Sequence, residues 1–171
     1  LDHLAHRFVT DGWSLKRLLR SIAVSETYRM SSRSTSLARR VDPDNLWLSH
    51  ARLRRLPAES IRDAILSASG GMNRRMFGPS IPLDLSRATP SRAKPTKNGP
   101  TDGKGRRSVY LEVRRNYLSE LLQAFDATNA TAPRGRRAVT NVPAQALSLM
   151  NDPFISGEAL RWGRRMTKRD S

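Results

Sequence analysis

The sequence predicts a mainly α-helical domain of irregular layout, with a short β element and a long loop rich in Pro, Gly and Lys. Apolar residues recur at helical spacing in several stretches of the 171-residue chain, and a short alternating run occurs at residues 108–113. Residues 78–105 contain five prolines and few hydrophobic residues. The length fits a single domain. The first residue is not Met and already lies in an amphipathic stretch, so we expect residues 1–171 to be a C-terminal fragment of a longer protein.

Two helices are predicted at the beginning of the chain. Residues 1–10 place apolar side chains on one helical face, and Gly12 fits the left-handed position after a helix end. Ser14 fits an N-cap for a second helix that continues to about Tyr28. Gly12 and Trp13 would therefore join two helices in a tight corner.

The middle of the chain alternates between loops and one clear helix. Residues 30–40 are rich in Ser and Arg and predict a loop, and residues 42–45 predict a turn or a helix start. Residues 57–60 open a helix, which residues 70–71 (Gly-Gly) end. Residues 78–105 predict a disordered or extended segment.

The C-terminal part predicts one strand and three helices. Residues 108–113 alternate in the manner of a strand, which must pair with the earlier loop or elsewhere in the parent protein. The three helices run from a cap at Asn116 to Phe125, from Thr140 or Asn141 with Pro143 near the first turn, and from about Phe154 to Thr167.

Composition excludes several kinds of chemistry. Cysteine is absent, which excludes disulfides, a Cys-based zinc site, a thiol nucleophile and c-type haem attachment within these residues. No apolar run is long enough to predict a transmembrane segment. The net charge of +16 favours polyanionic partners, but the basic residues are spread along the whole chain rather than clustered. Nucleic acid is therefore a less favoured partner.

A series of short motifs resembles a known family along nearly the whole chain. The motifs are Leu1-Asp2-x-Leu4-Ala5, Gly12-Trp13-Ser14-x-Lys16, Ser25-x-Thr27-Tyr28-Arg29-x-Ser31-Ser32, Asp42-Pro43-x-Asn45, Arg55-Leu56-x-Ala58-Glu59-x-Ile61-Arg62-Asp63, Ser69-Gly70, Arg106-Arg107-Ser108-x-Tyr110, Arg114-Arg115-Asn116, Phe125-Asp126 and Thr140-Asn141-x-Pro143-x-Gln145-Ala146-Leu147. Together they resemble the conserved domain of unknown function at the C-terminal end of planctomycete cytochrome-c-type proteins. Met30, Pro57 and His3 depart from the usual pattern.

The resemblance implies a mainly helical accessory domain of an exported bacterial protein, periplasmic or on the cell surface. The implied partners are the other domains of the parent protein, including a c-type cytochrome domain. The haem-binding Cys-x-x-Cys-His motif does not occur in these residues, so no cofactor is expected in this chain and haem would belong to a separate domain. The oligomeric state is not predicted.

Histidines and one pair of carboxylates are weaker candidates for chemistry. His3 and His6 are three residues apart on the first helix, which can begin a metal site, but zinc needs further ligands, so we favour a solvated helix face. Glu59 and Asp63 are four residues apart and could form an acid–base pair. We favour a structural role, in which Glu59 complements the helix dipole and Asp63 pairs with Arg55 or Arg74.

The strongest candidate is a network around Asp126. A carboxylate at a helix C-terminus opposes the helix dipole, so we expect it to have a cationic or backbone partner. Arginine binds carboxylates through two parallel hydrogen bonds, and the expected partners are Arg114, Arg115, Arg136 and Arg137. The alternative is an Arg cluster that binds an anionic ligand. The candidate residues for the structural network or the ligand site are Arg106, Arg107, Arg114, Arg115, Asp126, Arg136, Arg137 and Gln145.

We predict structural roles for one further polar residue and three tryptophans. The amide of Gln145 is expected to bond the backbone of the neighbouring loop. Trp13, Trp47 and Trp162 are interpreted as core or interface anchors rather than sugar-stacking platforms.

Three function classes follow from these observations. The leading hypothesis is a non-catalytic, accessory structural or interaction domain of an exported, haem-associated protein. The second is binding of nucleic acid or anionic polysaccharide through Arg-rich surface, and the third is a hydrolase that uses Asp63 or Asp126. No catalytic or metal-binding residue is assigned, and an enzyme is the less favoured reading.

Overall fold

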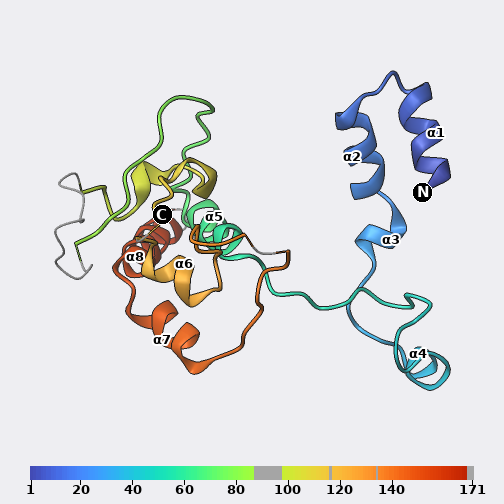
Figure 1. Cartoon of the computed structure of the whole chain (residues 1–171). Coiled ribbons are helices and arrows are strands. Elements are labelled where there is room, and N and C mark those ends of the chain that lie inside the picture. Colours follow the sequence, from blue (N-terminus) through green and yellow to red (C-terminus); the bar gives the residue numbers. More distant parts are fainter. Residues whose placement is uncertain (87–97, 116, 134, 169–171) are drawn as a thin grey trace. The chain divides into compact units, whose positions relative to one another are not determined.

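The computed structural model describes residues 1–86, 98–115, 117–133 and 135–168. These residues are mainly helical, as predicted, and contain no β-sheet (Figure 1). The chain divides into two compact units, residues 1–54 and residues 55–171, which we call the N-terminal unit and the C-terminal unit. The prediction that all 171 residues form one domain stays a prediction.

The N-terminal unit begins with the predicted helical corner. Helix α1 (Asp2–Thr10) and helix α2 (Leu15–Ala23) are joined through Gly12 and Trp13, which have positive φ angles of 71° and 58°. The Trp13 ring packs edge-on against Phe8, with ring centroids 5.3 Å apart. Ser14 is the N-cap of α2 and accepts a hydrogen bond from the Arg17 amide, as its sequence position predicts.

The predicted end of the second helix is wrong. Helix α2 ends at Ala23, and a separate short helix, α3 (Glu26–Arg29), follows it. The side chain of Ser25 accepts from the Tyr28 amide and so starts this new helix. An internal serine can cap a new turn, which the apolar pattern alone did not indicate.

The predicted loop at residues 30–40 contains helix α4 (Ser36–Val41) in its second half. Thr35 caps this helix by accepting from the Ala38 amide at 3.1 Å. Residues 42–45 then form a turn rather than a helix start. Asp42 holds it by accepting from the amides of Leu46 (2.7 Å) and Trp47 (3.0 Å).

Apolar residues of the N-terminal unit are not enclosed by its own contacts. The buried residues among residues 1–54, all of which are described, are Asp42 and Asn45. Trp13 is 68% exposed and Trp47 is 74% exposed. These two residues are therefore not core anchors, and Trp162 of the other unit, at 52% exposure, is not one either. Their role at an interface stays a prediction.

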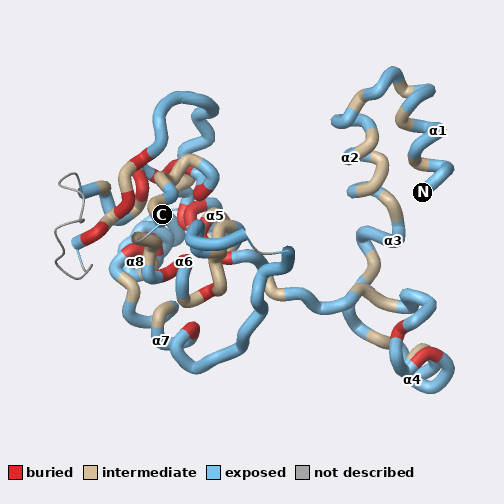
Figure 2. The backbone as a smooth tube through the Cα atoms, viewed as in Figure 1, coloured by how far each residue is buried: buried red, intermediate tan, exposed pale blue. Residues whose placement is uncertain are grey.

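The C-terminal unit has an apolar core between four helices. Helix α5 (Ala58–Ser69) contacts α6 (Glu120–Ala124) and α8 (Pro153–Thr167), and α7 (Pro143–Asn151) contacts α6 and α8. Figure 2 shows buried segments gathered where these helices meet. The buried apolar residues of this core are Ala58, Leu66, Leu121, Leu122, Phe125 and Phe154.

Sequence signals for the ends of these helices are mostly confirmed. Helix α5 begins after Pro57 and ends at Gly70, which has a left-handed φ of 79°. Pro143 is the first residue of α7, and Asp152 caps α8 by accepting from the Phe154 amide at 2.9 Å. The start of α6 is different, because it begins at Glu120; the predicted cap Asn116 lies outside the described residues.

The predicted strand at residues 108–113 is wrong. Ser108–Tyr110 form a 3₁₀ turn, η2, which follows another, η1, at Gly103–Gly105. The predicted pairing with the earlier loop does occur, as a parallel bridge between Ile81 and Leu111. The Ile81 amide donates to the Tyr110 carbonyl, and the Glu112 amide donates to the Ile81 carbonyl, both at 2.8 Å. The alternation does not mark a buried face here, because Val109 and Val113 are 73% and 66% exposed.

The described parts of the predicted loop, residues 78–86 and 98–105, are irregular but packed. Ile81, Leu83 and Leu85 are buried, with exposed fractions of 7% or less. Residues 87–97 of the predicted loop lie outside the described residues. The flanks of this segment thus contribute apolar surface to the C-terminal unit, which the low hydrophobic content did not indicate.

Candidate functional site

Asp126 follows Phe125, the C-cap residue of α6, and has a positive φ of 60°. Its carboxylate accepts hydrogen bonds from the Thr140 amide (2.8 Å), the Thr140 hydroxyl (2.9 Å) and the Arg55 guanidinium. The amide of Thr140 and then the guanidinium of Arg55 hold the pKa of Asp126 below its ordinary value. The carboxylate is therefore ionised at neutral pH and fully engaged by this chain.

The arginines predicted to pair with Asp126 are the wrong ones. Its cationic partner is Arg55, which precedes α5 and is 71 residues away in sequence. Sequence proximity favoured the neighbouring arginines, whereas the fold brings the start of α5 beside the end of α6.

Thr140 links this network to the next helix. Its carbonyl accepts from the Arg55 guanidinium and from the side-chain amide of Gln145, at 3.1 Å for Gln145. Gln145 is buried, with 6% exposure. This is the backbone contact that the sequence predicts for Gln145, and it fixes the segment between α6 and α7.

Arg106 is buried and has no carboxylate partner among the described residues. Its guanidinium lies 3.8 Å from the centre of the Tyr110 ring and donates to the carbonyls of Arg75 (3.1 Å) and Phe77 (2.7 Å). Its Nε is buried and has no hydrogen-bond partner in the described part of the chain. Arg106 therefore binds the backbone of the loop before Gly78 and does not bind Asp126.

The remaining predicted arginines do not form one cluster. Three of them pair with carboxylates other than Asp126: Arg107 with Asp63, Arg114 with Glu112, and Arg137 with Glu59. Arg115 and Arg136 are exposed, and neither side chain has a hydrogen bond or ion pair to another described residue. The alternative of a single Arg-rich site for an anionic ligand therefore lacks the geometry it would need among these residues.

Arg62 is a central polar residue that the sequence did not single out. It is 3% exposed and lies on the core-facing row of α5 with Ala58 and Leu66. Its guanidinium donates to the carbonyls of Arg106 (2.8 Å) and Asp102 (2.7 Å). Burial lowers the pKa of Arg62, but an arginine keeps its proton at neutral pH. The sequence did contain a signal for this burial: Arg62 lies four residues from both Ala58 and Leu66, which places all three on one face of the helix.

Asp63 and Glu59 have structural partners as well. Asp63 Oδ1 accepts from the amide (2.7 Å) and hydroxyl (2.8 Å) of Ser108, so its predicted partners, Arg55 and Arg74, are wrong. The hydrogen bond from Arg137 lowers the pKa of Glu59. A carboxylate with a lowered pKa is a poor general acid or base near pH 7. Glu59 and Asp63 therefore each have a partner within the chain, Arg137 and Ser108 respectively.

Another buried carboxylate joins α8 to the end of α5. Glu158 is 3% exposed and accepts a hydrogen bond from the Ser69 hydroxyl. Its other oxygen lies 3.5 Å from Arg161 Nε. Ser69 also accepts from the Gly71 amide at 3.1 Å, so this contact fixes the chain as it leaves α5.

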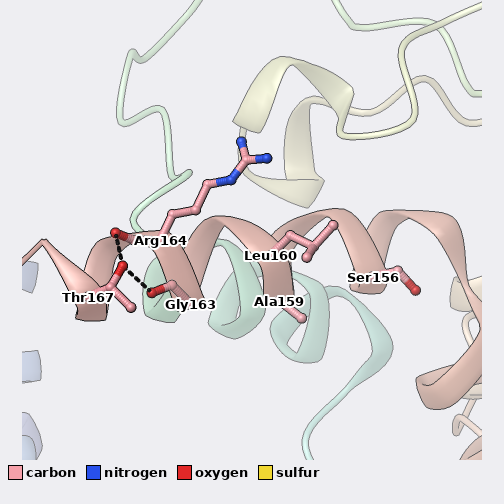
Figure 3. Close-up of a pocket in the computed structure, with 6 residues that line it drawn as sticks. All are labelled: Ser156, Ala159, Leu160, Gly163, Arg164 and Thr167. Carbon is pink, nitrogen blue, oxygen red and sulfur yellow. Dashed lines mark hydrogen bonds between the residues drawn. The ribbon is translucent and has the colours of Figure 1, made fainter.

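A shallow hollow runs along one face of α8 (Figure 3). The residues that line it are Ser156, Ala159, Leu160, Gly163, Arg164 and Thr167. In Figure 3 the Arg164 side chain extends away from the helix, and the small side chains leave the surface shallow. None of the candidate carboxylates lines this hollow.

The described parts of the chain contain no group of three His, Asp or Glu side chains placed to hold a metal ion. His3 and His6 lie on the exposed surface of α1, and His50 Nδ1 lies 3.2 Å from the Ser49 hydroxyl. No helix in these ranges is both long enough and apolar enough to cross a bilayer.

Fold and polar contacts define a helical protein whose segments are joined by buried arginines and carboxylates. The chain belongs to the PSD1 family, described as protein of unknown function (DUF1553), which matches residues 1–171. Comparisons with curated proteins and with solved structures give no match.

Proposed function

We propose that this chain is a non-catalytic accessory domain, structural or interacting, of an exported, haem-associated bacterial protein. The observation that carries the non-catalytic part is the engagement of the candidate carboxylates by other groups of the chain. Asp126, Asp63 and Glu59 each accept from arginine or from backbone and hydroxyl donors. The export and the haem association rest on the family resemblance of the motifs. The partners would be other domains of the parent protein, including a c-type cytochrome domain.

Substitution of Asp126 tests the non-catalytic role. We expect Asp126→Ala to lower the melting temperature of the 171-residue chain, because Arg55 and the Thr140 amide lose their acceptor. Asp44→Ala is the control, since Asp44 is exposed and has no described partner. The proposal fails if the unsubstituted chain hydrolyses polysaccharide or ester substrates and Asp126→Ala abolishes that turnover without changing stability.

The haem association needs a separate test on the parent protein. An antibody raised against this chain would isolate the intact protein from its source for a haem stain after denaturing electrophoresis. Covalent haem in that band is the expected result. An intact band without haem, located in the cytoplasmic fraction, would contradict both the haem association and the export.

Polyanion binding is the second candidate function. It is favoured by the net charge of +16 and by exposed guanidiniums without a described partner, such as those of Arg115 and Arg136. Release of counterions predicts that heparin or DNA affinity falls steeply with salt. A saturable complex that persists at physiological salt would support this role over the accessory one, and hydrolysis through Asp63 or Asp126 ranks below both.

A further inference from the structure

The loop formed by Arg74, Arg75, Met76, Phe77 and Gly78, which we call the 74–78 loop, exposes large apolar side chains. Phe77 is 77% exposed and Met76 is 65% exposed. Figure 1 shows this segment as part of a green loop that projects beyond α5, and Figure 2 shows the same loop as exposed. Exposure of apolar Phe and Met side chains to water is unfavourable, and their high exposed fractions show that contacts within the described chain offset little of this cost.

Phe77 also has an unfavourable backbone conformation. Its φ is 62°, in the left-handed region that bulky residues rarely adopt. Such a conformation persists only where surrounding groups hold it. Here the Phe77 amide donates to the Tyr110 hydroxyl at 2.9 Å, and Arg106 donates to the Phe77 carbonyl at 2.7 Å. The fold therefore maintains the exposed position of the ring against a local preference.

The backbone amides and carbonyls of Arg75 and Phe77 are bonded within the protein. Besides the two bonds of Phe77, the Arg75 carbonyl accepts from Arg106 at 3.1 Å, and the Arg75 amide donates to Asn73 Oδ1 at 3.0 Å. Pro79, which follows the loop, has no amide proton to satisfy. Unsatisfied backbone groups are the main cost of moving a loop into an apolar medium, and these bonds reduce that cost.

The charged side chains of the loop itself, Arg74 and Arg75, are both positive. Arg74 and Arg75 are exposed, and neither guanidinium has a partner among the described residues. No Asp or Glu occurs in the sequence between Asp63 and Asp84. Buried Arg106 lies behind the loop, so its charge adds to the positive potential of the tip without occupying the surface.

We propose that the 74–78 loop is a membrane-contact site, in which Met76 and Phe77 enter the interface of an anionic lipid bilayer. Aromatic side chains favour the lipid–water interface, and Arg74 and Arg75 would pair with the lipid phosphates. A projecting basic tip whose backbone is held by Tyr110 and Arg106 suits a deformable anionic surface. This proposal concerns the surface of the C-terminal unit alone and does not depend on the accessory function.

Vesicle binding by the full 171-residue chain tests the apolar part of the proposal. The probes are vesicles of phosphatidylcholine alone and vesicles of phosphatidylcholine with an equal amount of phosphatidylglycerol. We expect sedimentation only with the anionic vesicles. Phe77→Gly should weaken the binding about tenfold, which is the expected scale for losing part of a buried Phe side chain. Its melting temperature should not fall, because glycine accepts a positive φ without strain.

Val139→Ser is the matched control, because Val139 is 73% exposed at a different place in the same unit. This variant should bind anionic vesicles as the unsubstituted chain does. The proposal is overturned if the unsubstituted chain does not bind anionic vesicles, or if folded Phe77→Gly binds them equally well. Absence of lipid binding would leave a protein with an apolar, acidic pocket as the alternative occupant.

Two double variants, each of which removes two positive charges, test the contribution of the arginines to lipid binding. Arg74→Gln with Arg75→Gln should lower vesicle affinity by about thirtyfold, at roughly 1 kcal/mol for each arginine near the surface. Arg115→Gln with Arg136→Gln removes the same charge from other exposed positions and should have a smaller effect. Equal losses in the two variants would show general charge attraction and would overturn the assignment to this loop.

Discussion

Residues 1–54 and residues 55–171 both contain amphipathic helices, but they are held together in different ways. In the N-terminal unit the enclosed residues are Asp42 and Asn45, which bind backbone groups of a turn. In the C-terminal unit the core combines apolar side chains, such as Leu66, with the buried guanidinium of Arg62. The hydrogen bonds of the N-terminal unit fix a local turn. The apolar core of the C-terminal unit supplies most of the free energy that opposes unfolding.

The comparison shows where stability is expected to reside. Helix α2 presents Leu15 and Leu19 to solvent at 60% and 56% exposure, so its apolar face gains little from contacts within its own unit. The C-terminal unit encloses Leu66 completely, with 0% exposure. We therefore expect substitutions of equivalent chemistry to have unequal effects in the two units.

The largest expected effect is that of Arg62→Met. This change leaves the carbonyls of Asp102 and Arg106 without their donor and removes one of the two arginines beside Asp63. Loss of one partner from a buried charged network costs about 3 kcal/mol or more. The measurement is denaturant unfolding of the full chain. Arg17→Met in the exposed part of α2 is the control and should cost less than about 0.5 kcal/mol.

A matched pair of Leu→Ala substitutions compares how much apolar packing contributes to the free energy of unfolding in each unit. We expect Leu66→Ala to reduce the free energy of unfolding by about 2–5 kcal/mol, because it leaves a cavity in an enclosed site. Leu18→Ala, at a half-buried site of α2, should cost less than about 1 kcal/mol. Hydrogen exchange in each unit separates the two effects. Equal destabilisation would contradict the assignment of the main core to the C-terminal unit.

The pH dependence of stability should reveal the Asp126 contact. The folded pKa of Asp126 lies below its unfolded value, which is about 3.9, so the native state favours the ionised form. Its contribution is therefore fully present above the unfolded pKa and is lost as pH falls through the folded pKa. Thermal melts from neutral pH into this acid range should show a shallower loss of stability for Asp126→Asn. An unchanged acid slope would contradict this contribution.

The smallest effect is expected for the pair between Arg137 and Glu59. Their side chains are 49% and 35% exposed, so solvent screens the attraction. A double-mutant cycle with Arg137→Ala and Glu59→Ala should give a coupling below about 0.5 kcal/mol, decreasing with added salt. A coupling several times larger would show that this contact belongs to the structural network of the C-terminal unit.

Helix positions in this chain follow from local chemistry that the sequence displays. Ser14, Gly70 and Pro143 mark helix ends by cap geometry, left-handed φ and a fixed φ, each a property of one residue. The hydrogen bond of Gln145 to nearby Thr140 was likewise predictable, since it spans five residues. These features determined the helical class and most helix boundaries.

Tertiary structure alone decided which charged groups meet. Arg55 rather than a neighbouring arginine binds Asp126, and Arg62 binds the carbonyl of Arg106 across 44 residues. The exposed, positive-φ position of Phe77 likewise depends on Tyr110 and Arg106, which come more than 25 residues later. One chain with 31 basic and 15 acidic residues allows many such pairings of similar energy. The packing of the helices selects among them, because it fixes which side chains share a buried space.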